Sequence, residues 1–386
     1  MKLVHIVGNR PQFIKLALLH QSLERLTGSG GLIIHTGQHY SKDMSDIFFE
    51  QLRIPFPTHQ LGIRDLPHNS MIGNMMIGLD PLLAAEKPDG VIVYGDTNTT
   101  LAGALAAKKR DIPLAHIEAG IRTGREDMPE ESNRYVSDRL AALNFACTRL
   151  GVDNLLQEGF REAPAPDPLP PYTGIPNPGL PNHTGLPNRS PGQVYLTGDL
   201  MLDAARLCKD QATHQSSVLR EHSLEGRPFI LATIHRAENT GDPATLRAIL
   251  QALDRLHTEI PVLFPLHPRT RQIMDGLDLP VRVIMTPPVG YLDMLALVQS
   301  CQYVITDSGG LSREAYFFEK PSLVIMNNPF WPEIFEAGPS LQTKADMKEI
   351  LQRFGELANS GRSFRAGIFG DGQAASRISS ILSAAF

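Results

Sequence analysis

Acidic side chains follow apolar runs at several places in the first half of the chain. Asp96 follows one such run, Glu118 ends another, and Glu130 and Glu131 lie in a polar segment. Carboxylates that surround one pocket repel one another, which raises one pKa so that an acid and a base coexist near neutral pH. The pattern therefore favours acid–base catalysis.

These carboxylates also have structural interpretations. Asp96 is placed to cap a helix, and Glu130 and Glu131 are suited to the first turn of a helix, where the dipole stabilises them. Glu118 is harder to explain in this way, because a carboxylate among apolar residues costs burial energy unless it is paired or used. His235, beside Arg236 at the end of a later apolar run, is either a core histidine or an active-site group.

The second half carries a turn that suits a diphosphate. Asp307-Ser308-Gly309-Gly310 follows an apolar run, and a helix is expected from Leu311. Two glycines let the backbone approach an anion closely, while the helix N-terminus and the serine hydroxyl supply donors. The alternative is an ordinary strand–helix turn. Arg10, after the first apolar run, is either a fork for phosphate oxygens or a surface arginine.

Several other chemistries lack their motifs. No P-loop and no GxGxxG follows the first apolar run, and no DxD pair or HExxH supplies a metal-ligand set. A formal net charge of -5, from 36 basic and 41 acidic residues, argues against binding to nucleic acid or to a membrane surface. Three cysteines without a CxxC pair, no signal peptide and no run of ~18 apolar residues predict a soluble cytoplasmic protein.

Short apolar runs alternate with helical patterns, and this rhythm predicts parallel sheets covered by helices on both faces. The length of 386 residues favours two or three domains. Ligands bind such sheets at the carboxyl ends of the strands, where Arg10, Asp96, Glu118, His235 and the turn 307–310 fall. The predicted strands are 3–7, 32–35, 91–94, 114–117 and 143–147, then 229–234, 262–265, 281–285, 303–306 and 322–326.

Residues 163–192 are rich in proline, and they are expected to form a surface excursion between two domains. The sequons at Asn182 and Asn188 lie in this segment and are interpreted as accidental. The final residues 373–386 place Ile378, Ile381 and Leu382 on one face of a predicted helix.

Nine segments, in order along nearly the whole chain, resemble the non-hydrolysing UDP-N-acetylglucosamine 2-epimerases. They are Gly8–Lys15, Thr36–His39, Tyr94–Thr100, His116–Gly124, Pro129–Arg134, Thr233–Arg236, Thr306–Gly310, Glu314 and Gly370–Gln373. The resemblance implies an α/β, GT-B-like architecture in which two Rossmann-like domains with parallel sheets face a central cleft. The expected domains are an N-terminal domain with the acid–base residues (1–162), the Pro-rich linker (163–192), a UDP-binding domain (193–367) and a C-terminal helix that packs back on the first domain (368–386).

The activity that the resemblance implies is the interconversion of UDP-GlcNAc and UDP-ManNAc, without NAD or a metal, in a homodimer. UDP is eliminated across C1–C2 to leave 2-acetamidoglucal, and it adds back after a proton returns to the other face of C2. By position, the family's catalytic set corresponds to Asp96, Glu118, Glu130 and His235, without an assignment of either face. The corresponding substrate-binding residues are Arg10, Lys15, His39, Arg134, Arg236, His267, Ser308, Gly309, Gly310 and Glu314.

Three segments depart from the family pattern. Met326–Trp331 is apolar where many members carry a charged loop, His39–Asp46 lacks the glutamines that bind an activating nucleotide in some bacterial members, and Ser312-Arg313 replaces a more usual pair. The alternatives that stay open are a hydrolysing epimerase that releases ManNAc and UDP, an epimerase of a modified UDP-HexNAc, a GT-B glycosyltransferase, and an inactive UDP-sugar-binding protein.

Overall fold

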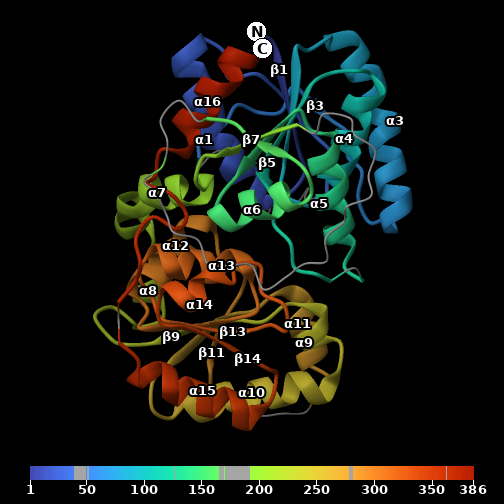
Figure 1. Ribbon diagram of the computed structural model, residues 1–386. Helices are drawn as coiled ribbons and strands as arrows, with labels where there is room; N and C mark the ends of the chain where they lie inside the picture. Colours follow the sequence, from blue (N-terminus) through green and yellow to red (C-terminus); the bar gives the residue numbers. More distant parts are fainter. Residues whose placement is uncertain are drawn as a thin grey trace. The chain divides into compact units, whose positions relative to one another are not determined.

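The computed structural model describes residues 1–38, 49, 52–125, 127–164, 169, 192–277, 281–361 and 363–386. These residues form two compact units, each of which contains a sheet and its helices (Figure 1). Unit 1 comprises Met1–Ala204 and Gly367–Phe386, and unit 2 comprises Ala205–Ala366. The chain therefore passes from one unit to the other twice.

Unit 1 contains a parallel sheet in the order β3-β2-β1-β4-β5-β6-β8-β7. Its strands are β1 (Leu3–Val7), β2 (Leu32–His35), β3 (His59–Gln60), β4 (Gly90–Tyr94), β5 (Leu114–Ala119), β6 (Leu143–Ala146), β7 (Arg161–Glu162) and β8 (Gln193–Leu196). Its helices are α1 (Arg10–Thr27), α3 (His68–Glu86), α4 (Asn98–Lys109), α5 (Pro129–Leu140), α6 (Arg149–Gln157) and α16 (Ala374–Ala385), and α7 (Leu200–Gln215) begins in this unit.

The sheet of unit 1 is covered on both faces, as the apolar runs predict. Ile34 belongs to a core cluster with residues of α3 and α4, whereas the ring of the next residue, His35, lies 5.2 Å from that of Phe13 on α1. Because successive side chains of a strand point to opposite faces, α1 lies on the face opposite α3 and α4. α16 packs beside α1 (Figure 1), so the C-terminal segment belongs to unit 1.

Unit 2 contains a second parallel sheet, in the order β11-β10-β9-β12-β13-β14. Its strands are β9 (Ile230–Thr233), β10 (Val262–Pro265), β11 (Ile284–Thr286), β12 (Tyr303–Thr306), β13 (Ser322–Ile325) and β14 (Ser340–Thr343). Its helices are α8 (Val218–Glu221), α9 (Ala237–Thr240), α10 (Pro243–His257), α11 (Pro268–Met274), α12 (Tyr291–Ser300), α13 (Gly309–Phe317), α14 (Glu333–Ala337) and α15 (Met347–Asn359). Residues of α10 and α15 share one core cluster with the strands.

The predicted fold class, two α/β units with parallel sheets, is confirmed. The second domain was predicted to begin at residue 193, but β8 pairs with β6 in the first sheet, and the chain divides after Ala204. The predicted excursion at 163–192 lies largely outside the described residues. Among the helices that are described, none is both long and apolar enough to span a membrane.

Candidate functional site

Glu118 is presented by an irregularity in β5. The pairing of β5 with β6 shifts register between Ile117 and Ala119, so that Glu118 is the extra residue of a β-bulge. Its φ of 72° lies in the left-handed region, which is rare for a residue other than glycine and is typical of functional sites. The bulge thus accounts for a carboxylate at the end of an otherwise apolar strand.

Lys15 supplies the partner of this carboxylate. Its Nζ lies 2.5 Å from Oε2 of Glu118, and the lysine side chain is almost fully buried on α1. A Cβ built on Gly95 would lie 3.8 Å from both Glu118 Oε1 and Lys15 Nζ, so the pair adjoins the turn that carries Asp96. The structure therefore brings together three of the residues predicted for the site.

Asp96 is not the cap of α4, because Thr97 occupies the N-cap position. Its carboxylate instead accepts a hydrogen bond from Arg134 Nη2, and its main-chain oxygen accepts one from Asn133 Nδ2 at 2.9 Å. Arg134 also donates from Nη1 to Glu131 Oε2 at 2.5 Å. The guanidinium thus ties α5 to the turn after β4.

The two neighbouring glutamates at the start of α5 differ in their surroundings. Glu131 is buried and accepts from Thr123 N at 2.9 Å, Thr123 Oγ1 at 2.9 Å and Gly124 N at 3.0 Å. Glu131 therefore braces the loop before α5, in line with its structural interpretation. Glu130 is only partly buried and lies in the first turn of the helix. Its side chain can therefore contact solvent or a ligand.

A buried network of charged side chains fixes the turns that follow β4 and β5. Asp138 receives His116 Nδ1 at 2.7 Å, Arg122 Nη1 at 2.8 Å and the Gly120 N–H at 3.2 Å. His116 Nε2 lies 2.7 Å from the carbonyl oxygen of Gly95. Burial raises the pKa of the Asp138 carboxyl, but the charge of Arg122 and the hydrogen bond from His116 hold the pKa below its ordinary value.

In unit 2, the turn after β12 has the form that its sequence predicts. Ser308 is the N-cap of α13, and its hydroxyl accepts the Leu311 N–H at 3.3 Å. α13 begins at Gly309, so its first N–H groups, including that of Gly310, form a helix N-terminus of the kind that binds anions. Glu314, one helical turn further on, is buried.

His235 follows β9, and its side chain is 40% exposed, which excludes the core-histidine interpretation. Its Nδ1 lies 3.0 Å from Oδ1 of Asp307, the residue before the Ser308 turn. The rings of His235 and His267 have centroids 6.0 Å apart, so these two predicted residues are neighbours.

Arg236 lies against Met326–Trp331, the apolar segment that departs from the family pattern. Its Nε donates to the main-chain oxygen of Asp307 at 2.9 Å, and its guanidinium stacks 4.6 Å from the ring of Phe330. Trp331 donates from Nε1 to the Gly309 carbonyl at 2.9 Å. The apolar segment thus packs on the predicted phosphate-binding turn, a role that periodicity does not predict.

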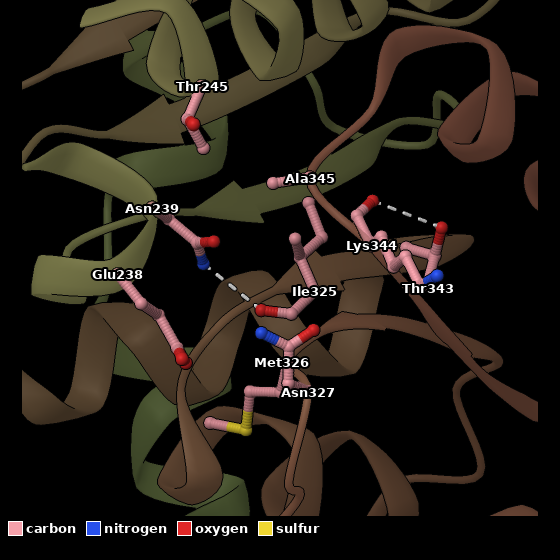
Figure 2. A pocket seen from close by; sticks show the side chains of 9 residues that line it. All are labelled: Glu238, Asn239, Thr245, Ile325, Met326, Asn327, Thr343, Lys344 and Ala345. Carbon is pink, nitrogen blue, oxygen red and sulfur yellow. Dashed lines mark hydrogen bonds between the residues drawn. The ribbon is translucent and has the colours of Figure 1, made fainter. Parts of the chain in front are cut away.

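A pocket lies at the carboxyl ends of β13 and β14, and Asn239 of α9 is one of its lining residues. Figure 2 shows Asn239 directed at the carbonyl of Ile325, to which its Nδ2 donates at 3.0 Å. The same Nδ2 lies 3.1 Å from Asp307 Oδ2. The residues around the pocket are Glu238, Asn239, Thr245, Ile325, Met326, Asn327, Thr343, Lys344 and Ala345.

One group of possible metal-ligand atoms occurs in the described part of unit 1. An oxygen of Glu118, the sulfur of Cys147 and an oxygen of Asp199 lie within 4.8 Å of one another. Because the Lys15 ammonium already neutralises Glu118, a metal ion in this group would meet a competing positive charge.

The predicted site residues fall into two sets. Unit 1 holds Asp96, Glu118 and Glu130 with Arg10, Lys15 and Arg134, and unit 2 holds His235, Arg236, His267, Ser308, Gly309, Gly310 and Glu314. His39 lies outside the described residues. Asp138 and Asn239 were not predicted, and Asp307 was predicted only as the first residue of the diphosphate turn, since the partners of these residues are distant in the sequence and no local pattern marks the contacts.

Comparison with known proteins bears on the family of the chain. A family model described as UDP-N-acetylglucosamine 2-epimerase matches residues 22–383. A UDP-2,3-diacetamido-2,3-dideoxy-D-glucuronate 2-epimerase of Pseudomonas aeruginosa is 39% identical over 99% of both chains, and a UDP-N-acetylglucosamine 2-epimerase of Methanocaldococcus jannaschii is 33% identical over 99% of both.

A solved structure supports the same relationship. The crystal structure of M. jannaschii UDP-GlcNAc 2-epimerase in complex with UDP-GlcNAc and UDP matches with a TM-score of 0.85 and 32% identity, over the full length of both chains. Together with the family match, this likeness confirms the resemblance of the nine sequence segments. The chain belongs to the UDP-N-acetylglucosamine 2-epimerase family.

Proposed function

We propose that the protein epimerises UDP-N-acetylglucosamine at C2 to give UDP-N-acetylmannosamine. The observation that carries this proposal is the pair of carboxylates, Asp96 and Glu118, at the ends of the adjacent strands β4 and β5 of a chain from this family. Each is held against a cation, Arg134 or Lys15, at hydrogen-bonding distance. Such fixed, partly buried acids suit proton transfer to and from carbon.

The proposed reaction is an elimination followed by an addition. The C2–H bond breaks, its electron pair forms the C1–C2 double bond of 2-acetamidoglucal, and UDP departs with the electrons of the C1–O bond. A proton then returns to the opposite face of C2, and UDP adds back to C1. Inversion needs acid–base groups on two faces, and we assign this work to Asp96, Glu118, Glu130 and His235 as a set.

The departing diphosphate needs positive charge and dipoles that are already in place. We assign the UDP moiety to unit 2, where the Ser308 hydroxyl and the first N–H groups of α13 supply such donors. The other residues that we assign to substrate binding are Arg10, Lys15, His39, Arg134, Arg236, His267, Gly309, Gly310 and Glu314.

Deuterium exchange tests the proposal directly. Incubation with UDP-GlcNAc in D2O should place deuterium at C2 and yield the manno isomer, which ¹H NMR of the nucleotide sugars detects. Free ManNAc that accumulates irreversibly would instead identify a hydrolysing epimerase. Binding of UDP-GlcNAc without exchange would identify an inactive sugar-nucleotide-binding protein, and absence of exchange with every UDP-HexNAc would refute the proposal.

A modified UDP-HexNAc is the second candidate substrate, and one observation favours it. The relative at 39% identity is named for a 2,3-diacetamido glucuronate sugar, whereas the M. jannaschii enzyme, which is named for UDP-GlcNAc, is 32–33% identical. A panel that varies the group at C3 and the oxidation state at C6 separates the two candidates, because the preferred donor should exchange its C2 proton with the highest kcat/KM.

We also propose that the reaction needs neither NAD nor a metal and that the working form is a homodimer. Exchange should then persist after dialysis against EDTA and without added NAD. Light scattering at assay concentration should give about twice the mass of one 42.4 kDa chain. A single-chain mass with full activity would contradict the dimer.

A further inference from the structure

Asp307 gathers more hydrogen-bond donors than a strand–helix turn needs. Its side chain is fully buried, and its carboxylate accepts the main-chain N–H groups of His235 at 3.0 Å and Arg236 at 2.9 Å. The side chain of Asn239 donates to it at 3.1 Å, and His235 Nδ1 lies 3.0 Å from Oδ1. One carboxylate therefore holds both the backbone and the ring of His235.

The charge of Asp307 determines which ring nitrogen carries the proton. Burial raises the pKa of this carboxyl, but the hydrogen bonds from His235, Arg236 and Asn239 outweigh burial and lower the pKa below its ordinary value. An ionised carboxylate only accepts hydrogen bonds, so Nδ1 must donate to it. The neutral ring then carries its lone pair on Nε2, on a side chain that is 40% exposed.

Asn239 keeps the carboxylate in this orientation. Its buried amide nitrogen donates to the carbonyl of Ile325 (Figure 2) and also to Asp307 Oδ2. Oδ2 thus accepts from three fixed donors, the N–H groups of His235 and Arg236 and the Asn239 Nδ2. The other oxygen, Oδ1, shares the His235 N–H at 3.1 Å and faces Nδ1 of the His235 ring at 3.0 Å.

We propose that Asp307 is a positioning residue for His235: it selects the Nδ1–H tautomer and so directs the Nε2 lone pair outward. The inference rests on the proposed function, in which His235 is an acid–base group. Carboxylates that orient an imidazole in this way act without touching substrate, and their loss costs about 10–100-fold in activity at metal sites. A comparable loss is expected here.

Asp307→Asn gives a specific expectation. The amide oxygen must take the Oδ2 place, because Arg236 N and Asn239 Nδ2 both donate there. The amide nitrogen is then forced toward His235 Nδ1, which has to accept, so the ring changes to the Nε2–H tautomer. The main-chain oxygen of residue 307, which receives Arg236 Nε at 2.9 Å, is unchanged by the substitution.

The test combines a spectroscopic signature with kinetics. In protein labelled with ¹⁵N-histidine, long-range ¹H–¹⁵N spectra report the tautomer of each ring, and His235→Gln identifies the signal. The wild type should show Nδ1–H and Asp307→Asn should show Nε2–H. kcat with UDP-GlcNAc should fall about 10–100-fold in Asp307→Asn, while the Kd of UDP, followed through Trp331, the chain's one tryptophan, changes less than about threefold.

Asp254→Asn is the matched control, since it makes the same chemical change in a carboxylate that pairs with Arg282 at the surface of unit 2. It should leave the His235 tautomer and kcat unchanged. An Nε2–H tautomer in the wild type overturns the inference even if the Asp307→Asn protein fails to fold. An unchanged tautomer in Asp307→Asn, or a changed tautomer with full kcat, also overturns it. A wild type that shows Nδ1–H but has no epimerase activity refutes the proposed function alone.

Discussion

At the scale of single residues, the β-bulge at Glu118 is the feature most directly linked to chemistry. Glu118→Gln removes the charge and the basicity but keeps the shape, so C2 deuterium exchange should fall about 10²–10⁴-fold, the usual contribution of a general acid or base. NMR of UDP-GlcNAc in D2O measures this. The fold should remain intact, because the amide still accepts a hydrogen bond from Lys15, which lies 2.5 Å from the native carboxylate.

The matched control for that change is Glu86→Gln. Glu86 also faces a lysine, with Lys2 Nζ at 2.8 Å, but this pair lies at the surface and away from the strand ends that hold Asp96 and Glu118. Its substitution should leave exchange unaffected. If both variants lost activity equally, charge loss in general, and not the position of Glu118, would be the cause.

The same scale shows what the sequence can and cannot reveal. Glu118 was recognisable because a carboxylate in an apolar strand is unusual, and His235 because it stands beside Arg236 at a strand end. Asp138 gave no such signal, since an aspartate on a helix face is common, and Asp307 was recognisable only as part of the turn 307–310, without its role toward His235. Their importance arises from partners such as His116, 22 residues away from Asp138, which only the fold brings near.

At the scale of elements, the turn after β5 depends on a close approach to α6. Gly120 has a φ of 82°, and a Cβ added there would lie 2.1 Å from the main-chain oxygen of Gly151. Gly120→Ala should therefore destabilise the fold by more than the ~1–3 kcal/mol of backbone strain alone, and it should displace Glu118. Urea unfolding and C2 exchange measure the two effects.

Gly159→Ala distinguishes the effect of backbone strain from the effect of a steric clash at the added Cβ. Gly159 has a similar φ of 89°, but nothing lies within 4 Å of its added Cβ. This variant should lose only the free energy of backbone strain and should keep its activity. If Gly120→Ala and Gly159→Ala destabilised the fold equally, the backbone at Gly151 would have moved to accept the added Cβ, and the contact with α6 would not fix the turn.

The attachment of α16 to unit 1 should depend on pH. Asp203 of α7 accepts the Ala375 N–H at 2.8 Å at the start of α16, while its Oδ1 has no hydrogen-bond partner in the described part of the chain. Burial, more than the nearby Asp199 and Asp371, raises the pKa of Asp203 to about 6. The folded state therefore favours the protonated form, and the free energy of unfolding should fall as pH rises from about 4 to about 6.

Asp203→Asn tests this dependence, because asparagine still accepts the Ala375 N–H but carries no charge. At pH 7 the variant should be more stable than the wild type by up to about 3 kcal/mol, which is the linkage value of a shift of roughly two pKa units. At pH 4 the two should be equal. Chemical denaturation at both pH values measures the difference, and a variant less stable than wild type at pH 7 would contradict the assignment.

At the scale of the whole molecule, the sequence predicted the two parallel sheets because buried parallel strands are continuous apolar runs. It missed β8 and placed the domain boundary before it, since Gln193–Leu196 follows the proline-rich segment and shows no sign of which sheet it joins. It missed β14 as well, because three of the four residues of Ser340–Thr343 are polar and form no apolar run. Both strands pair at or near a sheet edge. Which strand they pair with there depends on the strand order of the fold and not on their local sequence pattern.

The division of the chain between the units leads to a prediction about truncation. Unit 1 is completed by the last twenty residues, and α16 buries Ile378, Ile381 and Leu382. Three such side chains contribute roughly 5–9 kcal/mol, which is comparable to the whole stability of a domain, about 5–15 kcal/mol. Deletion of residues 374–386 should therefore unfold unit 1.

Unit 2 has a core cluster of its own, so it should survive this deletion. Trp331, the chain's one tryptophan, lies in unit 2, and its emission reports that unit alone. The truncated protein should retain a cooperative denaturant transition in tryptophan fluorescence and lose part of its far-ultraviolet circular dichroism, while Leu207→Ser at an exposed site serves as control. Simultaneous loss of both signals would mean that the two units fold as one, because only then does unit 2 need α16.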